Sequence, residues 1–445
     1  MNQAPLIPDI AVIVLAAGKG TRMKSELPKV LHPMAGMPML GHVLTAARTL
    51  NPTQTVVITG YGAEQVEAYC TENFPETTFA RQAEQLGTGH AIMQAEQALK
   101  TFTGTVIIVY ADIMLGTRPD VLPTLMEQHR SNAQGLTLLT ANVPNPKGFG
   151  RVFMQKGILI NVEEKDCTPE QKKITTVNPC IYAVNGPLLF KLLAQVSNNN
   201  AQNEYYLTDI IALAHTNGAP VIMAEVPAER PEIGMNSRAE VAEMETLWQT
   251  RKRQEMMANG VTLVDPSTVY FSADTTIKPD VTIHPNVVFG PGVTIHSGAT
   301  VFPFCHIANA TLHKGVEIGP FARLRQGVTL NENVHIGTFV ESKNSTFGQG
   351  SKAMHLSYIG DATVGAEAGF GGGTITANYN QKTKVKSRTV LENGAMTGAN
   401  STLVAPVKLG KNARTGAGTV VRNDIEEGAL LVSKPEQITK PGYNK

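Results

Sequence analysis

A loop that combines glycines with cations follows an aliphatic run near the start of the chain. Residues 10–15, IAVIVL, form the kind of continuous β-branched run that is typical of a central parallel strand. Residues 15–23, LAAGKGTRM, then bring Lys19 and Arg22 together with two glycines, and Lys29 follows shortly afterwards. Glycine lets the backbone approach a phosphate closely, and the cations supply positive charge. Because α/β sheets bind ligands at the carboxyl ends of their strands, this pattern predicts a phosphate-binding loop.

The loop matches neither of two common nucleotide-binding fingerprints. A Walker A loop requires Gly-x4-Gly-Lys-Ser/Thr and a Rossmann loop requires Gly-x-Gly-x-x-Gly, and neither fits residues 15–29. A tight turn between a strand and a helix would explain the glycines alone. Arg22 and Lys29 have no such structural explanation, so we interpret the loop as another kind of nucleotide site.

Length and charge limit the possible architectures and partners. The chain has 445 residues, and the usual size of about 100–200 residues per domain suggests two or three domains. Lys and Arg number 38 against 37 Asp and Glu, which leaves a net charge of +1. Such a balance gives no overall field that would attract nucleic acid or an anionic membrane. We therefore expect neither kind of partner, and any basic site must be local.

Cysteine usage and hydropathy favour a cytoplasmic location. The four cysteines, Cys70, Cys167, Cys180 and Cys305, show no CxxC spacing and no Cys/His zinc pattern, so we expect reduced thiols. The N-terminus differs from a signal peptide, and no apolar run reaches the roughly 18 residues that a membrane span requires.

The first half of the chain alternates between strand-like and helix-like segments up to about residue 226. Short apolar runs at 55–59, 106–110 and 136–141 alternate with helical patterns at 40–50, 90–99 and 206–215. This order predicts a mostly parallel sheet covered by helices.

A charged, helix-favouring segment follows at 237–259 and ends at Asn259-Gly260, which predicts a linker helix. We expect Trp248, the only tryptophan, to anchor this helix by packing rather than to contact a ligand.

Beyond Gly260 the hydrophobic period becomes six residues. Apolar residues recur at this step in two series, and the register slips by one residue between Ile307 and Leu312: Ile277, Ile283, Phe289, Ile295, Val301 and Ile307, then Leu312, Ile318, Leu324, Leu330 and Ile336. Small or β-branched residues stand four positions after members of the first series: Val281, Val287, Val293, Ala299, Cys305 and Thr311. The step continues later in the chain through Leu391, Thr397, Leu403, Leu409, Thr415 and Val421.

A period of six is the signature of a parallel β-helix, in which stacked repeats share one core. The repeat resembles the left-handed hexapeptide β-helix of acyltransferases, whose members usually associate as trimers. A purely structural rod would show the same period. Residues 375–386 fit the repeat poorly at their start, so we expect a loop that projects from the rod.

Two further motifs, QAEQLGTGH at 82–90 and NNNAQNEYYLTDI at 198–210, accompany the loop and the repeat. In this order the features resemble the family of bifunctional N-acetylglucosamine-1-phosphate uridyltransferase/glucosamine-1-phosphate acetyltransferases over almost the whole chain. The resemblance implies an α/β protein with three parts: a Rossmann-like nucleotidyltransferase domain with a mostly parallel sheet at 1–232, a linker helix at 233–260, and a left-handed β-helix acetyltransferase domain at 261–445. It also implies a homotrimer that uses acetyl-CoA and UTP as co-substrates.

The resemblance assigns a uridylyl-transfer site to the first part. Arg22 and Lys29 would stabilise the charge that develops when a sugar phosphate attacks the α-phosphorus of UTP. Asp112 and Asn236 would hold Mg²⁺, which prefers oxygen ligands, and Asp112 also follows a predicted strand end. A solvated aspartate at a strand end is the structural alternative. The positions that match nucleotide- and sugar-binding residues are Leu15, Ala16, Ala17, Gly18, Lys29, Gln82, Gly87, Thr88, Gly150, Glu163, Asn178 and Asn236.

The resemblance assigns an acetyl-transfer site to the rod. His355 lies in the segment GSKAMHLSY, which matches the general-base segment of the family, and histidine is suited to accept a proton near neutral pH. The substrate-binding positions would be Arg325, Lys343, Tyr358 and Gly369. Acetyl-CoA would be held by Asn378, Tyr379, Ala399, Ala417 and Lys434.

Several residues depart from the family pattern. Ala111 and Pro179-Cys180 stand where smaller residues are usual, so the sugar site is expected to be more crowded. In the rod, Gly369 replaces an expected Asn, and Lys434 replaces an Arg and so loses a bidentate fork. Two turns also differ, at Asn380-Gln381 and Glu392-Asn393.

Two other functions are compatible with parts of this pattern. One is a sugar-1-phosphate nucleotidyltransferase whose rod is structural or regulatory, although residues 82–90 and His355 argue against it. The other is a non-catalytic interaction protein built on the same folds, although the cations of the loop argue against it.

Overall fold

The computed structural model describes the chain except for residues 1–8, 114–119, 201, 226–233, 435–436 and 443–445. The chain divides into two compact units, Met1–Trp248 and Gln249–Lys445. The expected boundary between residues 232 and 233 lies outside the described residues. The division between the units falls within helix α7 (Arg238–Ala258).

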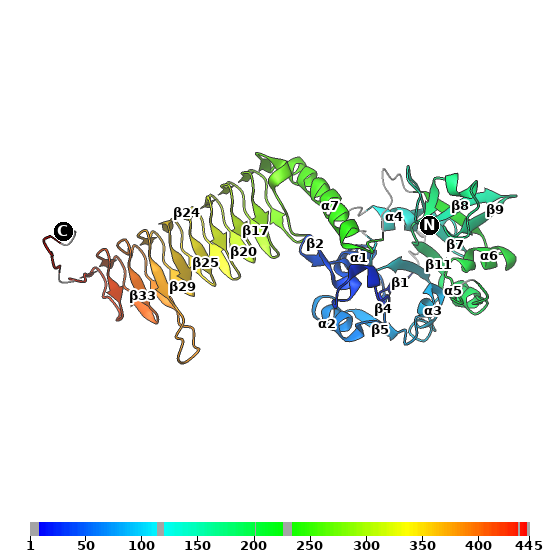
Figure 1. The fold of residues 1–445 in the computed structure, drawn as a ribbon, viewed down its shortest axis with the longest axis horizontal. Helices are drawn as coiled ribbons and strands as arrows, with labels where there is room; N and C mark the ends of the chain where they lie inside the picture. Colours follow the sequence, from blue (N-terminus) through cyan, green and yellow to red (C-terminus); the bar gives the residue numbers. More distant parts are fainter. Residues whose placement is uncertain (1–8, 114–119, 201, 226–233, 435–436, 443–445) are drawn as a thin grey trace, which may run out of the picture. The chain divides into compact units, whose positions relative to one another are not determined.

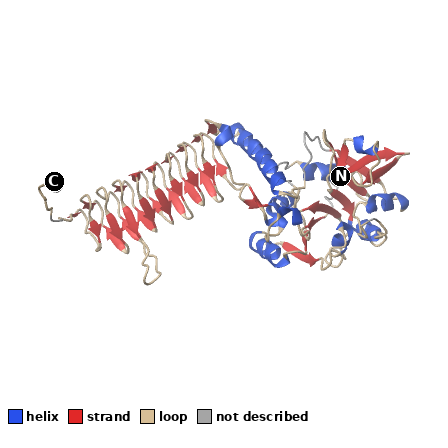
Figure 2. Ribbon diagram, viewed as in Figure 1, coloured by secondary structure: helices blue, strands red, loops and turns tan. Residues whose placement is uncertain are grey.

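A twisted mixed sheet forms the centre of the first unit (Figures 1 and 2). Strand β1 (Ile10–Leu15) lies between β4 (Gln54–Thr59) and β6 (Thr105–Tyr110), and both pairings are parallel. The complete order is β5-β4-β1-β6-β11-β7-β10-β8-β9, and β12 (Val221–Glu225) pairs with β7. The expected parallel arrangement therefore holds on the β1 side of the sheet.

The strands beyond β6 introduce antiparallel pairs. These strands are β7 (Leu136–Asn142), β8 (Gly150–Gln155), β9 (Ile158–Val162), β10 (Thr176–Asn178) and β11 (Tyr182–Asn185). Strand β11 pairs antiparallel with both β6 and β7, whereas β5 (Thr77–Arg81) extends the parallel side. The sheet is therefore mixed, with the predicted phosphate-binding loop on its parallel side.

Helices cover both faces of the sheet. Alternate side chains of β1 enter two separate cores, with Val12 and Val14 on one face and Ala11 and Ile13 on the other. The first core includes residues of α1 (Met39–Arg48), α2 (Ala63–Asn73) and α4 (Val121–Arg130). The second includes residues of α3 (Thr88–Met93), α5 (Gly186–Leu193) and α6 (Asp209–Thr216). The helix expected at 90–99 ends at Met93 and continues as turns.

A helix, α7, occupies most of the segment predicted to be helical, and Trp248 packs as expected. Its side chain is buried, and its ring meets His42 edge-on with centroids 6.4 Å apart. In the second unit, the Gln249 amide donates to the Phe271 carbonyl (2.7 Å) and accepts from the Phe271 N–H (2.9 Å). None of the helices that the structure describes is both long and apolar enough to cross a membrane.

The second unit is a left-handed parallel β-helix with three sheets of short strands (Figure 1). Each turn of the helix, called a coil below, passes once through every sheet. Ile277 pairs with Ile295, 18 residues later, so one coil contains three six-residue repeats. All apolar residues of the predicted period-six series are buried. The apolar residues that recur every six positions thus form the buried core of the rod.

The slip of register has a structural cause at β20 (Ala310–Leu312). Ala310 and Leu312 point inward, whereas Thr311 lies between them and is only partly buried. Ala310 therefore takes the small inward position of this repeat, and Thr311, four residues after Ile307, does not.

The loop expected at 375–386 begins later than predicted. Ile375–Ala377 form β31 within the rod, and the chain returns at β32 (Thr389–Leu391). Between them, residues 378–388 form a loop that projects from the rod (Figure 1). A bridge between Tyr379 and Lys386 closes its base. The first three residues of the predicted loop belong to the rod because they pair with β33 (Thr402–Val404) and the Thr376 side chain is buried.

Candidate functional site

A cavity of about 370 Å³ opens at the carboxyl ends of β1 and β6. Many of the residues predicted to bind nucleotide or metal line this cavity: Leu15, Ala16, Ala17, Gly18, Lys29, Gln82, Gly87, Thr88, Asp112 and Asn236. The structure therefore brings together segments that are far apart in the sequence, as expected for a ligand site at strand ends.

A cation and two oxygen ligands meet in this cavity. The Lys29 ammonium donates to Asp112 Oδ2 and, at 3.1 Å, to Asn236 Oδ1. Asn236 is held by its neighbours, since its amide donates to the Gly234 carbonyl (2.7 Å) and its backbone N–H to Glu240 Oε2 (2.6 Å). The Asp112 carboxylate and the Asn236 amide oxygen thus both face the Lys29 ammonium, which places a positive charge between them.

Gly20 creates the space for Lys29. Its φ of +60° is a left-handed conformation, and a Cβ on Gly20 would lie 2.5 Å from Lys29 Cβ. The glycine thus serves the lysine, whereas Gly18 faces open space and lines the cavity. Arg22 follows in the short 3₁₀ turn Thr21–Met23 and is exposed outside the cavity lining.

The two motifs at 82–90 and 198–210 lie side by side. The Gln82 amide donates to the Gly87 carbonyl at 3.0 Å. Gly89 N–H donates to the Tyr205 carbonyl (2.7 Å), and Tyr205 N–H donates to the Leu86 carbonyl (2.8 Å). A Cβ on Gly87 would lie 2.6 Å from the same Tyr205 carbonyl, so only glycine fits there. Residues 198–210 therefore hold residues 82–90 in place through backbone hydrogen bonds.

A second cavity of about 740 Å³ adjoins the first. Thr88, Tyr110 and Glu204 line both cavities. Glu163 lines the larger one, where burial raises the pKa of its carboxyl while Thr208 and Asn161 hydrogen-bond it. A site with two compartments is suited to a substrate with two parts.

Two predicted sugar-binding residues do not line this cavity. Asn178 is buried, and its amide donates to the Tyr182 hydroxyl (2.9 Å) and to Asn161 (3.1 Å). Gly150 pairs with Asn178 across β8 and β10. These residues lie behind the wall that contains Glu163, and Asn161 connects the two groups.

The residue pair Pro179-Cys180 changes the wall of the same cavity. Cys180 lines this cavity. Its φ of +63° is a left-handed conformation that residues other than glycine rarely adopt. Burial, with the Glu163 and Asp112 carboxylates nearby, raises the pKa of the thiol to about 12. Cys180 is therefore a protonated wall residue and not a nucleophile.

Some cavity residues are absent from the predicted set. Tyr110, Glu204 and Thr208 all line the larger cavity. Tyr110 ends the strand that leads to Asp112, and the other two lie within the 198–210 motif. Position at the end of a strand was thus a usable signal for Tyr110, and membership of a motif was one for Glu204 and Thr208.

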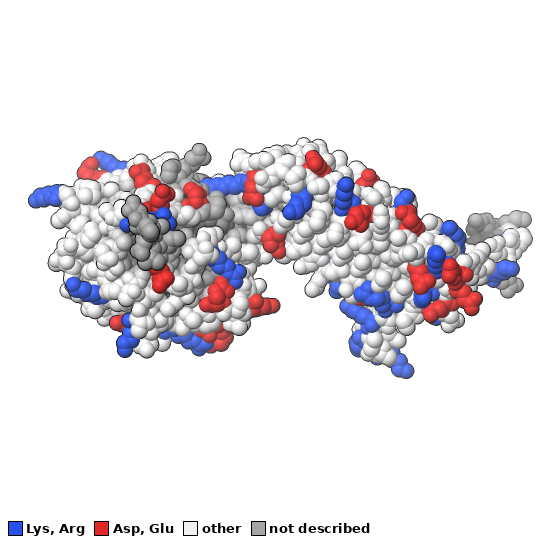
Figure 3. Space-filling model, turned by 180° about the vertical axis from the view of Figure 1, so that it is seen from behind, with Lys and Arg blue, Asp and Glu red and all other residues white. Residues whose placement is uncertain are grey.

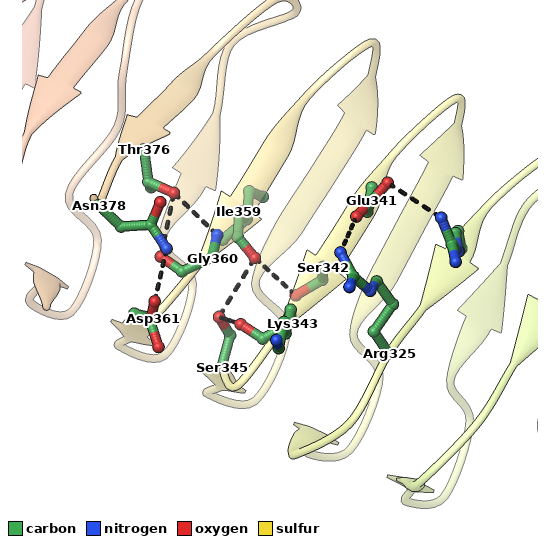
Figure 4. A network of polar contacts seen from close by, with 11 residues as sticks. Arg325, Glu341, Ser342, Lys343, Ser345, Ile359, Gly360, Asp361, Thr376 and Asn378 are labelled. Carbon is green, nitrogen blue, oxygen red and sulfur yellow. Dashed lines mark hydrogen bonds and ion pairs between the residues drawn. The ribbon is translucent and has the colours of Figure 1, made fainter. Parts of the chain in front are cut away.

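On the rod, two predicted phosphate-binding cations share one face (Figure 4). Leu324 pairs with Ser342, and Lys343 pairs with Gly360, so Arg325, Lys343 and Gly360 occupy one position on three successive coils. The Arg325 guanidinium forms an ion pair with Glu341 at 2.8 Å.

Two more predicted residues, Tyr358 and Asn378, approach each other beside Gly360. A Cβ on Gly360 would lie 2.4 Å from the Tyr358 hydroxyl and 2.8 Å from Asn378 Nδ2. Because Gly360 has no side chain, Tyr358, the predicted sugar contact, and Asn378, the predicted acetyl-CoA contact, can occupy the same space beside it.

His355 ends strand β27 (Lys352–His355) at the neighbouring corner of the rod, and its side chain is exposed. Backbone N–H groups of the next coil donate to the carbonyls of His355, Gly372 and Ala399 at 3.2, 2.7 and 2.8 Å. His355, Gly372, Ala399 and Ala417 therefore form one column on successive coils, called the histidine column below. A Cβ on Gly372 would lie 3.3 Å from His355 Cβ, so the glycine keeps space beside the imidazole.

Comparison with known proteins decides between the possible families. The nucleotidyl transferase family matches residues 11–227. Bifunctional protein GlmU of Zymomonas mobilis subsp. mobilis is 44% identical over 439 residues, covering 98% of this chain and 96% of the relative. The protein of the same name from Ralstonia pickettii is 42% identical over 454 residues, covering 98% of both chains. That from Dinoroseobacter shibae is 45% identical over 438 residues, covering 98% and 96%.

The chain belongs to the GlmU family. A solved structure of UDP-glucose pyrophosphorylase complexed with UDP-glucose covers 55% of the chain at 17% identity with a TM-score of 0.46, which is too low to add support.

Within this GlmU-family chain, further departures lie in the rod. A Cβ at Gly369 would meet only ordinary contacts, the nearest at 3.7 Å, so the position has room for a side chain. Lys434 is exposed after the last strand, β37 (Leu430–Leu431). The Asn380 side chain accepts from the N–H groups of Lys382 and Thr383 at 3.0 and 3.1 Å, so Asn380 stabilises the altered turn of the loop.

Proposed function

We propose that this chain makes UDP-N-acetylglucosamine in two steps. Residues 261–445 transfer acetyl from acetyl-CoA to glucosamine 1-phosphate, and residues 1–232 then transfer uridylyl from UTP to N-acetylglucosamine 1-phosphate. Residues 233–260 link the two parts. The observation that carries the proposal is that one chain of this family contains both the Lys29–Asp112–Asn236 cluster and the histidine column.

In the uridylyl step, a phosphate oxygen of the sugar phosphate attacks the α-phosphorus of UTP, and the bond to pyrophosphate breaks. Arg22 and Lys29 neutralise the negative charge that develops. The backbone of residues 15–18 and the residues Gln82, Gly87 and Thr88 hold the nucleotide in the smaller cavity. In the larger cavity Glu163 holds the amino sugar, with Gly150 and Asn178 shaping the wall behind it.

Asp112 and Asn236 would hold Mg²⁺ in this site. Their oxygens suit a hard cation, and the position between them already attracts the Lys29 ammonium, which supports the assignment. A bound Mg²⁺ supplies further neutralisation of the triphosphate charge. No cluster of three or more His, Cys, Asp or Glu side chains suited to a metal occurs among the described residues, and Mg²⁺ needs few protein ligands because phosphates and water complete its shell.

In the acetyl step, the His355 imidazole accepts a proton from the 2-amino group as the nitrogen attacks the thioester carbonyl. The carbon–sulfur bond then breaks and coenzyme A leaves as the thiol. Arg325 and Lys343 hold the phosphate, and Tyr358 and Gly369 lie beside the sugar. Asn378, Tyr379, Ala399, Ala417 and Lys434 hold acetyl-CoA.

We also propose a homotrimer. Phe304, Phe321 and Phe339 stack along one corner of the rod, with ring centroids 4.9 and 5.2 Å apart. They are 52%, 46% and 56% exposed, and Leu356 extends the stripe at 64%. These four residues, called the apolar corner below, lie between the histidine column and the face with Arg325 and Lys343. An exposed apolar stripe of this kind favours burial against another copy, which would bring the two halves of the site together.

A substrate panel tests the proposed function. Purified protein is given glucosamine 1-phosphate with acetyl-CoA, and separately N-acetylglucosamine 1-phosphate or glucose 1-phosphate with UTP or ATP. We expect release of free thiol in the first reaction, and pyrophosphate release only with UTP and the acetylated sugar. Turnover of glucose 1-phosphate without any thiol release would instead indicate a single-activity nucleotidyltransferase.

A further inference from the structure

Asp361 connects three successive coils of the rod at one corner. It follows β28 (Tyr358–Gly360) and has a φ of +50°. Its Oδ1 accepts from the Asn344 amide of the preceding coil. Its Oδ2 accepts from the Asn378 amide of the following coil (Figure 4). A single carboxylate therefore binds two amides, one on each side.

This arrangement fixes which way the Asn378 amide faces. An ionised carboxylate can only accept hydrogen bonds, whereas an amide has one donor end and one acceptor end. Asn378 must present its Nδ2 to Asp361 and turn its Oδ1 away (Figure 4). An Asn at position 361 would impose no such choice, because it could donate as well as accept.

The same residue secures the base of the loop at 378–388. Ser387 N–H donates to the Asn378 carbonyl at 2.9 Å, directly beside the bridge between Tyr379 and Lys386. The Arg388 guanidinium donates to the Ala362 carbonyl at 3.0 Å. Both ends of the loop therefore attach to the coil that contains Asp361, while the basic tip with Lys382 and Lys384 is exposed (Figure 3).

We propose that Asp361 is a positioning residue for acetyl transfer. It sets the orientation of the Asn378 amide beside the Tyr358 hydroxyl and holds the loop in the conformation that receives acetyl-CoA. This inference rests on the proposed function, in which Asn378 contacts that co-substrate. Asp361 itself takes no part in the chemistry.

Asp361→Asn tests the inference with almost no change of shape. We expect KM for acetyl-CoA to rise about 10-fold, as for the loss of one charge-assisted hydrogen bond, while kcat changes by less than about twofold. Trypsin should also cut the loop faster at Lys382, Lys384 and Lys386, as followed by mass spectrometry. The double variant Asp361→Asn with Asn378→Asp restores a donor and an acceptor to the pair and should recover much of the wild-type cleavage rate.

Asp280→Asn is the matched control. Asp280 is also an aspartate of the rod in a left-handed conformation, with a φ of +61°, and it lies outside the proposed site. We expect this variant to keep the wild-type KM and cleavage rate, and both variants to keep uridylyl transfer.

The outcomes separate this inference from the proposed function. An unchanged KM and an unchanged cleavage rate in Asp361→Asn would overturn the positioning role. A parallel loss of kcat and of thermal stability, without rescue by the double variant, would also overturn it and indicate a purely structural role. If the wild-type chain releases no thiol, the proposed acetyl transfer fails, whereas the cleavage rates still test the Asp361–Asn378 contact.

Discussion

At the residue scale, the first unit contains a buried histidine that makes stability depend on pH. His129 is fully buried, its Nδ1 lies 2.8 Å from Thr137 Oγ1, and burial lowers its pKa to about 4. The unfolded chain binds this proton near the usual pKa of about 6.5. Stability is therefore complete above about pH 6.5 and is lost as the pH falls towards 4, by about 3 kcal/mol from this group.

Urea unfolding followed by Trp248 fluorescence measures this effect, because the only tryptophan lies in the first unit. The Glu163 and Asp209 carboxyls have raised pKa values, and their contributions run in the opposite direction. Comparison with His129→Gln isolates the histidine. We expect the variant to lose less stability than the wild type between pH 7 and pH 4.5, and equal losses would contradict the assignment.

At the element scale, the loop after β1 depends on Gly20. In Gly20→Ala the new Cβ must displace Lys29 and the backbone must keep a φ of +60°. We expect pyrophosphate release from UTP to fall about 100-fold, as for a small misplacement of a catalytic group. Thiol release by the rod should not change.

Gly157→Ala controls for backbone strain. Gly157 has a φ of +77° but faces open space, so this variant introduces strain without touching the cavity. We expect its uridylyl transfer to remain near the wild-type rate. An equal loss in both variants would show that strain, and not displacement of Lys29, causes the defect.

The elements also show how far sequence can predict this structure. The rod was predictable because every coil repeats the same inward positions, so Ile277, Ile283 and Phe289 identify three sheets directly. The one-residue slip of the six-residue period between Ile307 and Leu312 was visible in the sequence. The direction of the Thr311 side chain was not, because the sequence does not show on which side of Thr311 the repeat is one residue shorter. In the first unit, the pairing of residues 82–90 with 198–210 joins distant segments. No local pattern encodes that contact, and none separates the buried Asn178 from the cavity-lining Glu163.

At the scale of the whole molecule, the apolar corner connects assembly to activity. Phe321 lies in the middle of the aromatic stack. We expect Phe321→Glu to convert the trimer into smaller species in analytical ultracentrifugation, because a buried charge without a partner is costly. Thiol release should fall with the loss of the trimer, whereas uridylyl transfer should persist. A wild-type monomer, or a trimeric variant with full thiol release, would contradict the proposed assembly.

The coupled reaction from glucosamine 1-phosphate, acetyl-CoA and UTP to UDP-N-acetylglucosamine tests both proposed activities in one assay. Wild type, His355→Ala and Asp112→Ala are compared for release of thiol and pyrophosphate. We expect His355→Ala to lose thiol release by at least about 100-fold but still to use added N-acetylglucosamine 1-phosphate, whereas Asp112→Ala should release thiol and accumulate that intermediate. Normal thiol release by His355→Ala, or near-normal pyrophosphate release by Asp112→Ala, would contradict it.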